Sequence, residues 1–84
     1  MQYFVYLLEC RDGSYYCGYT TDVQKRVVNH NKGIGSKYTK RRRPVRLIYF
    51  EELPTKSDAL KREYAIKQFS RKAKEELIYK KSYV

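Results

Sequence analysis

The stretch YFVYLLECRDGSYYCGYT, residues 3 to 20, decides the fold of this chain. Residues 3 to 9 are rich in aromatic and β-branched side chains, and residues 15 to 19 form a second such run. The segment Arg11-Asp12-Gly13-Ser14 between them is typical of a turn. The pattern therefore predicts a β-hairpin at the start of the chain.

The register of this hairpin depends on the length of its loop. A two-residue turn would pair Tyr6 with Tyr19 and send Tyr16 to the opposite face of the sheet from Tyr6. A three-residue loop, with a left-handed Gly13 that forms a bulge, pairs Tyr6 with Gly18 instead. Side chains alternate between the faces of a strand, so only the second register puts Tyr6 and Tyr16 on one face. We favour this register if the two tyrosines share a site.

A helix should follow the hairpin. Residues 21 to 24, TDVQ, have the form of a capping box, so we expect the helix to begin at about Asp22 and to end near Asn31. Arg26 and His30 lie one turn apart on its surface. They flank a narrow apolar stripe that should anchor the helix to the sheet, and they should point into the seam between the two. The stripe consists of Val23 and Val27.

The remaining elements follow from similar patterns. Residues 32 to 43 contain glycines but no apolar periodicity, and we expect a loop that becomes strongly basic. Residues 45 to 50 alternate well enough for a third strand. A second capping box, TKSD at residues 55 to 58, should open a helix that runs to about Gln68, and Ser70 should cap a last helix through Tyr79. The sequence therefore predicts an α+β fold with the element order β-β-α-β-α-α.

The first of the two later helices carries an acid on its expected inward face. That face should consist of Ala59, Leu60, Glu63, Tyr64, Ile66 and Lys67. Burying an unpaired carboxylate is costly, so Glu63 should have a cation, a metal ion or several donors near it. The last helix should be a packing element, with three residues facing inward: Ala73, Leu77 and Ile78.

The composition limits the class of protein. We expect one domain over residues 1 to 84, in which 19 Lys and Arg outnumber 9 Asp and Glu to give a net charge of +10. Such a charge attracts polyanions, so nucleic acid is the first partner to consider and an anionic membrane surface the second. No window approaches the ~18 consecutive apolar residues of a membrane-spanning helix, and the start of the chain lacks the features of a signal peptide. We expect a cytoplasmic protein without a membrane partner.

Cysteine and histidine are scarce in this chain. Two cysteines are too few for a disulfide framework, and with one histidine they fall short of a four-ligand zinc site. We therefore expect Cys10 and Cys17 to be reduced thiols buried in strands.

The order and spacing of the polar residues resemble the GIY-YIG nuclease family, in particular its small stand-alone bacterial members. Tyr6 matches the tyrosine that ends the first family triplet, while Tyr16 and Gly18 match the first and last residues of the second. Arg26 and His30 match the arginine and histidine of the first helix. On a later helix, the metal-ligand glutamate of the family is matched by Glu63.

The resemblance covers the chain from Tyr3 to about Ile78. It departs from the family at Phe4, where the first triplet has glycine, and at Cys17, where the second has isoleucine. Neither position carries chemistry. The fold that the resemblance implies is a three-stranded antiparallel sheet flanked by helices, which agrees with the elements predicted from periodicity.

The resemblance implies hydrolysis of a DNA phosphodiester with one divalent cation, Mg²⁺ or Mn²⁺. Glu63 would hold the ion, and Arg26 would bind the phosphate oxygens as charge builds in the transition state. Tyr6 would be the general base, with His30 and Tyr16 orienting it and the water by hydrogen bonds. A free phenol has a pKa of about 10, so cationic neighbours must lower that pKa or the proton transfer must be concerted. His30, with an unperturbed pKa of about 6.5, would relay the proton.

Each of these residues also has a purely structural interpretation. Tyrosines in a small domain with strands are mostly core and cross-strand partners. Arg26 could pair with Asp22 and Glu63 with Lys67, at a spacing where an exposed ion pair is worth only about 0.3 to 0.5 kcal/mol. The functional interpretation rests on the residues taken together in the family order.

Residues 37 to 46, KYTKRRRPVR, carry six cations that no acid interrupts. We expect them to contact the backbone of a nucleic acid, DNA rather than RNA, which positions the chain without reading bases. The predicted contact residues are Lys37, Lys40, Arg41, Arg42, Arg43 and Arg46, with Lys67 on a later helix.

Two classes of function remain open. The first is a metal-dependent DNA endonuclease that acts in repair or recombination on branched, nicked or flapped DNA, since nothing resembles a sequence-reading helix. The second is a non-catalytic or weakly active binding module of the same fold, with an unidentified protein partner supplying specificity. A weaker third is a basic RNA-associated protein of ribosomal type, in which Glu63 would have no role. A nuclease should bind a metal ion through Glu63, whereas a binding module need not.

Overall fold

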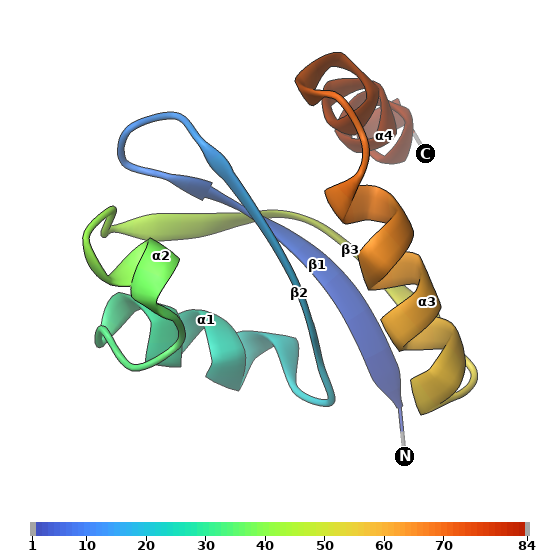
Figure 1. Ribbon diagram of the computed structural model, residues 1–84, viewed down its shortest axis with the longest axis horizontal. Coiled ribbons are helices and arrows are strands. Elements are labelled where there is room, and N and C mark those ends of the chain that lie inside the picture. Colours follow the sequence, from blue (N-terminus) through green and yellow to red (C-terminus); the bar gives the residue numbers. More distant parts are fainter. Residues whose placement is uncertain (1, 84) are drawn as a thin grey trace.

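The computed structural model describes residues 2–83 and has the predicted fold class (Figure 1). Three strands form one antiparallel sheet in the order β2-β1-β3. In chain order the elements are β1 (Tyr3–Cys10), β2 (Tyr15–Thr20), α1 (Val23–Asn31), α2 (Lys37–Lys40), β3 (Val45–Leu53), α3 (Lys56–Lys67) and α4 (Arg71–Tyr83).

The hairpin of β1 and β2 has the register that places both motif tyrosines on one face. Tyr6 pairs with Gly18, and Leu8 pairs with Tyr16. Gly13 closes the three-residue loop with a φ of 84°, a left-handed conformation that glycine adopts at little cost. The prediction of a three-residue loop is therefore confirmed.

The central strand β1 is buried on both of its faces. Tyr6, Leu8 and Cys10 form one cluster, against which Val27 of α1 packs. The alternate residues of β1 belong to a second cluster with α3, on the other side of the sheet. Figure 1 shows α1 and α2 on one side and α3 on the other. The sheet thus separates the basic segment and α1 from α3.

The starts of the three longer helices are capped by side chains. Asp22 caps α1, accepting a hydrogen bond from the backbone N of Lys25 at 3.0 Å, so the cap lies one residue after the threonine of the predicted capping box. Thr55 caps α3 and Ser70 caps α4 as predicted, through contacts to Asp58 N at 3.0 Å and Ala73 N at 3.1 Å.

The prediction that residues 32 to 43 form only a loop is wrong. Residues 37 to 40 form the one-turn helix α2, because the hydroxyl of Ser36 caps it by accepting from the backbone N of Thr39 at 3.1 Å. Thr39 is completely buried, whereas Lys37 and Lys40 are exposed. One turn is too short to give an apolar period, so the sequence pattern could not reveal it.

The predicted inward face of α3 is only partly correct. Ala59 and Ile66 are fully buried and Glu63 is half-buried, but Leu60 is 41% and Tyr64 71% exposed. Lys67 is exposed as well. The helix instead turns Arg62 toward β3, where its Nε lies 2.5 Å from a carboxylate oxygen of Glu51. The face of α3 that packs on the sheet thus combines the buried Ala59 and Ile66 with this ion pair.

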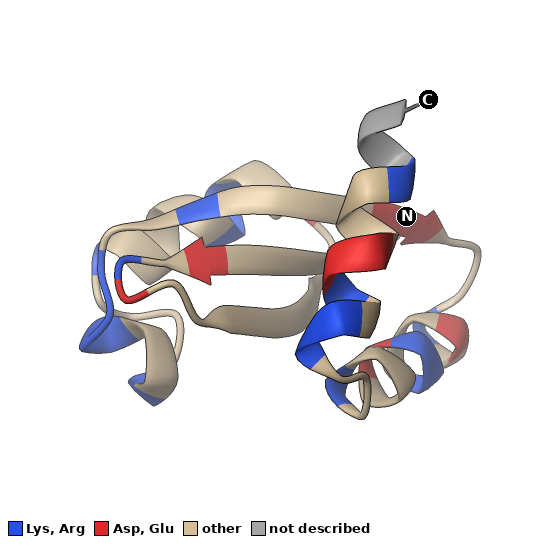
Figure 2. Cartoon of the chain, turned by 90° about the horizontal axis from the view of Figure 1, so that it is seen from above, with Lys and Arg blue, Asp and Glu red and all other residues tan. Residues whose placement is uncertain are grey.

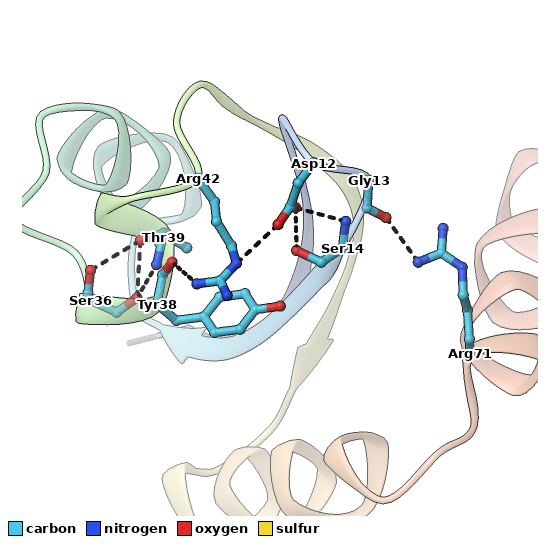
Figure 3. A network of polar contacts seen from close by, with 8 residues as sticks. All are labelled: Asp12, Gly13, Ser14, Ser36, Tyr38, Thr39, Arg42 and Arg71. Carbon is cyan, nitrogen blue, oxygen red and sulfur yellow. Dashed lines mark hydrogen bonds and ion pairs between the residues drawn. The ribbon is translucent and has the colours of Figure 1, made fainter.

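The helix α4 and the hairpin loop are joined by Arg71. Its Nη1 donates to the carbonyl of Gly13 at 2.8 Å (Figure 3). Its guanidinium also lies 4.2 Å from the ring centroid of Tyr15. Leu77 and Ile78 pack against the core, which confirms α4 as a packing element.

Both cysteines are buried free thiols in strands, as expected. Within residues 2–83, no helix is long and apolar enough to cross a membrane.

Candidate active site

Three of the predicted site residues meet where α1 packs on the sheet. The hydroxyl oxygen of Tyr6 lies 2.8 Å from Nε2 of His30, and Nε of Arg26 donates to the same oxygen at 3.3 Å. Tyr6 and His30 are completely buried, and Arg26 is half-buried. Arg26 also donates to the carbonyl of Gly35 at 3.3 Å. The structural alternative for Arg26, a pair with Asp22, is not formed among the described residues, since Asp22 caps α1.

Two glycines make room for this cluster. A Cβ on Gly18 would lie 2.5 Å from the hydroxyl oxygen of Tyr6, and one on Gly35 would collide with the ring of His30. The family triplet pointed to Gly18, but the sequence analysis missed Gly35. Its only signal in the sequence was a second glycine close after Gly33.

The cluster continues beyond His30 into α2. Nδ1 of His30 lies 2.8 Å from Oγ1 of Thr39, which in turn lies 3.0 Å from the hydroxyl of Ser36 (Figure 3). Sequence analysis missed both hydroxyl residues. A serine three residues before a threonine is compatible with a helix cap, but this pattern is too common to single them out.

Tyr16 joins the cluster through its ring. It packs edge-on against His30, with ring centroids 5.1 Å apart, and stacks on Tyr38 at 5.9 Å. Among the described residues its hydroxyl makes no hydrogen bond to Tyr6, so the expected orientation of Tyr6 by a hydrogen bond is not seen. In this structure the ring of Tyr16 lines one side of the site.

Glu63 approaches the site from the other side of the sheet, beside the edge strand β2. Its backbone carbonyl lies 3.9 Å from the sulfur of Cys17, the strand neighbour of Gly18. The Glu63 side chain is 18% exposed, and Nζ of Lys67 lies 3.4 Å from its carboxylate. The ion pair of the structural interpretation is therefore formed. Glu63 has no hydrogen bond to Tyr6, but its charge contributes to the raised pKa of Tyr6.

The donors available for a metal ion are few. No group of three or more His, Cys, Asp and Glu side chains that could hold an ion occurs among the described residues. A single half-buried carboxylate suits Mg²⁺, which keeps most of its waters and takes one or two protein carboxylates. The donor set at Glu63 therefore fits an ion of this kind.

Burial controls the protonation of the cluster. It raises the pKa of Tyr6 to about 12, more than the hydrogen bond from Arg26 lowers it. It also lowers the pKa of His30 from 6.5 to about 4, assisted by the charge of Arg26. The hydrogen bond to Tyr6 raises the pKa of Arg26. At neutral pH the site thus holds a neutral phenol, a neutral imidazole and a guanidinium cation.

These protonation states correct part of the predicted mechanism. The cationic neighbour does not bring the pKa of Tyr6 toward neutrality, and His30 does not titrate near 6.5. A lowered pKa of Tyr6, one of the two routes left open by the sequence, is therefore not seen in this structure.

The predicted nucleic-acid-binding residues fall into two groups. Lys37, Lys40 and Arg41 are exposed, make no ion pair among the described residues, and line a hollow beside Tyr38. Figure 2 shows basic residues concentrated on the helices and on the segment between α2 and β3, while the strands are mostly uncharged. Arg11, which the sequence analysis missed, lines an adjoining hollow with Lys40 and Arg41.

The other four predicted contacts also interact with groups of the protein itself. Arg42 pairs with Asp12 at 3.1 Å and stacks 3.9 Å from the ring centroid of Tyr38 (Figure 3). Arg43 donates to the carbonyl of Lys40 at 2.9 Å. The two remaining cations have acidic partners, Glu9 for Arg46 and Glu63 for Lys67.

The family model for the GIY-YIG catalytic domain matches residues 2–76. The chain belongs to the GIY-YIG family. Membership of this family indicates a nuclease that binds nucleic acid, and GIY-YIG nucleases generally use divalent metal ions.

This GIY-YIG protein has close relatives. It is 56% identical over 77 residues to a UPF0213 protein of Staphylococcus saprophyticus, covering 92% of this chain and 94% of the relative. A UPF0213 protein of Halobacterium salinarum is 59% identical over 73 residues, which cover 87% of this chain and 95% of the relative.

Solved structures share its fold. The solution NMR structure of the protein EF2693 from E. faecalis has a TM-score of 0.68 and 42% identity, covering 100% of this chain and 90% of that one. The solution NMR structure of the UPF0213 protein BH0048 from Bacillus halodurans has a TM-score of 0.61 and 48% identity. The match covers 94% of this chain and 84% of that one. The predicted family and the predicted fold are both confirmed.

Proposed function

We propose that this GIY-YIG protein is a metal-dependent DNA endonuclease. The observation that carries the proposal is the chain of hydrogen bonds from Arg26 through Tyr6 to His30. A buried phenol between a permanent cation and a neutral imidazole can accept a proton while passing on its own. Branched, flapped or nicked DNA in repair or recombination, within the cytoplasm, is the setting we propose.

The residues of the chain have distinct roles in this proposal. Tyr6 takes a proton from the attacking water, and its own hydroxyl proton passes to Nε2 of His30, 2.8 Å away. This concerted transfer avoids a free phenolate, which burial makes unfavourable. Arg26 supplies a planar cation that stabilises the charge on the phosphate oxygens. Tyr16 closes the ring cluster around His30.

Glu63 is the proposed ligand of a divalent cation, Mg²⁺ or Mn²⁺. When bound, the ion would supply Lewis-acid stabilisation of the leaving oxygen. The half-buried carboxylate of Glu63 is the acid that stands close enough to Tyr6 to influence its pKa. Lys67 would then share its carboxylate partner with the ion.

One observation favours a second candidate, a binding module of the same fold that cuts DNA slowly or not at all. Tyr6 and His30 have no exposed surface, so a reacting phosphate and water must be admitted by movement of the side chains around them. In this case a protein partner would supply the opening or the specificity. The exposed cations of α2 serve either candidate equally.

A cleavage assay separates the two candidates. Purified protein is incubated with supercoiled, linear, flapped and branched DNA in Mg²⁺, Mn²⁺ or EDTA. We expect metal-dependent cutting that falls at least about 100-fold in Tyr6→Phe, since removing the base of a proton transfer typically costs 10²- to 10⁴-fold. Tight binding with no cutting on any form, or cutting equal in Tyr6→Phe, would favour the binding module.

The basic surface gives a prediction of its own. Lys40 and Arg41 each line both hollows, so Lys40→Gln/Arg41→Gln should remove about two phosphate contacts. The slope of log K against log salt on duplex DNA should then become shallower by about 1.8, at 0.9 per contact. The charge-matched control is Lys72→Gln/Lys80→Gln on α4, which should leave the slope unchanged. Equal changes in both variants would mean that binding depends only on net charge.

A further inference from the structure

We propose that Thr39 is a positioning residue that holds His30 in the tautomer with its proton on Nδ1. The proposal rests on the proposed function in one respect: this tautomer leaves Nε2 free to accept the proton of Tyr6. Thr39 lies on α2, away from the reacting groups, and acts through the imidazole ring.

The direction of each hydrogen bond follows from the partners available. Arg26 carries only donors, so the hydroxyl oxygen of Tyr6 must accept from it. Tyr6 is buried, and the other atom within hydrogen-bonding distance of that hydroxyl among the described residues is Nε2 of His30, at 2.8 Å. Tyr6 therefore donates to Nε2. A neutral imidazole has one proton, which must then lie on Nδ1.

Thr39 receives that proton. Its Oγ1 lies 2.8 Å from Nδ1 and accepts from it. The hydroxyl hydrogen of Thr39 is directed to Ser36, whose hydroxyl lies at 3.0 Å and whose carbonyl lies at 3.4 Å. Every hydrogen bond from Arg26 to Ser36 thus has a donor and an acceptor. Among the described residues no buried side-chain nitrogen or oxygen lacks a partner.

The opposite tautomer, with the proton on Nε2, would leave some of these donors and acceptors unpaired. A proton on Nε2 would point at the oxygen of Tyr6, which already accepts from Arg26, and the hydroxyl hydrogen of Tyr6 would lose its acceptor in a buried place. Thr39 would also have to turn its hydrogen from Ser36 to Nδ1. By accepting from Nδ1, the hydroxyl of Thr39 adds to the effect of Arg26 and Tyr6, and together they favour the tautomer in which Nε2 is a base.

The backbone makes Thr39 a rigid support. Its own N–H donates to the hydroxyl of Ser36 at 3.1 Å, which is the cap that starts α2. Lys37 and Lys40 on the same turn are exposed, so this turn presents two of the proposed nucleic-acid contacts and also supplies the hydroxyl that contacts His30.

His30 is the one histidine of the sequence, so its ring nitrogens can be observed without assignment ambiguity. The experiment records the ¹⁵N resonances of the imidazole at pH 7 by long-range proton–nitrogen correlation, in the wild type and in Thr39→Val and Thr39→Ser. Valine has nearly the volume of threonine without its hydroxyl, and serine keeps the hydroxyl. Cleavage of the preferred DNA is measured in parallel.

We expect the wild type and Thr39→Ser to show the proton on Nδ1, with cleavage within about threefold of each other. Thr39→Val should raise the share of molecules with the proton on Nε2, because the Nδ1 proton loses its acceptor, and should reduce cleavage at least about tenfold, with DNA affinity unchanged. Thr39→Ala gives the same comparison if Thr39→Val does not fold.

The measured tautomer of His30 tests the role of Thr39 independently of any cleavage activity. If the hydroxyl-free variant has no larger share of the Nε2 form than the wild type, or if the wild type already has its proton on Nε2, the inference is wrong. If no DNA is cut by the wild type, the proposed function fails, while the tautomers of the three proteins still test the role of Thr39.

Discussion

Glu63→Gln is expected to reduce metal-dependent DNA cleavage at least about 100-fold while leaving DNA affinity in EDTA within about twofold. Glutamine keeps the size of the side chain but removes the charge that a divalent cation requires of its single protein carboxylate. Metal-dependent cleavage and binding to labelled DNA in EDTA are the two measurements. The affinity should hold because Glu63 is an acid and contributes no attraction to phosphate.

The matched control for Glu63 is its ion-pair partner. Lys67→Gln breaks the 3.4 Å pair without altering the carboxylate. The pair spans helix positions four apart and Lys67 is half exposed, so its loss should cost no more than about 0.5 kcal/mol of unfolding free energy. Cleavage should stay within about threefold of the wild type. Equal loss of cleavage in the two variants would identify the ion pair, and not a metal ion, as the role of Glu63.

Gly18→Ala is expected to damage both the fold and the site. The new Cβ would lie 2.5 Å from the hydroxyl oxygen of Tyr6 and 2.7 Å from its Cζ. Tyr6 is fully buried and hydrogen-bonded, so its ring has no free space into which to move. Overpacking of this kind costs about 1 to 3 kcal/mol of unfolding free energy. Urea denaturation measures this loss, and cleavage should fall at least about 100-fold because Tyr6 is displaced.

Gly13→Ala is the control for Gly18. A Cβ on Gly13 meets nothing within 4 Å, but its φ of 84° strains any L side chain. The Gly13→Ala variant should therefore lose about 1 kcal/mol of unfolding free energy. It should retain wild-type cleavage, since the loop lies away from Tyr6. If Gly18→Ala loses stability but cuts DNA normally, the space beside Tyr6 is needed for folding alone.

Much of the fold could be predicted because it depends on local patterns. Alternation fixed the strands, and the turn at Gly13 fixed the hairpin once the tyrosines were required to share a face. Hydroxyl caps marked the starts of α3 and α4. The rotation of α3 could not be predicted, because it depends on contacts with the sheet, among them the ion pair of Arg62 with Glu51. That pair joins two elements that no local pattern relates.

The candidate site shows a similar division. Spacing on one helix put Arg26 and His30 on one face, and hairpin register placed Tyr6 beside them. The partners of His30 in α2 were missed, because a single capped turn has no period and Thr39 lies in a segment dominated by cations. The sequence predicted that all cations of that segment contact nucleic acid, and it could not show that Arg42 and Arg43 also make contacts within the protein.

The sequence by itself determined the family and the order of the strands and the three longer helices, and it indicated the candidate site residues, since these depend on residue types at short spacings. Only the tertiary structure decided which cations are exposed, which face of α3 is buried and which protons the site carries. Burial sets the last of these, raising the pKa of Tyr6 to about 12 and lowering that of His30 to about 4. Desolvation arises when distant segments close over a group, and so it is absent from any local pattern of residues.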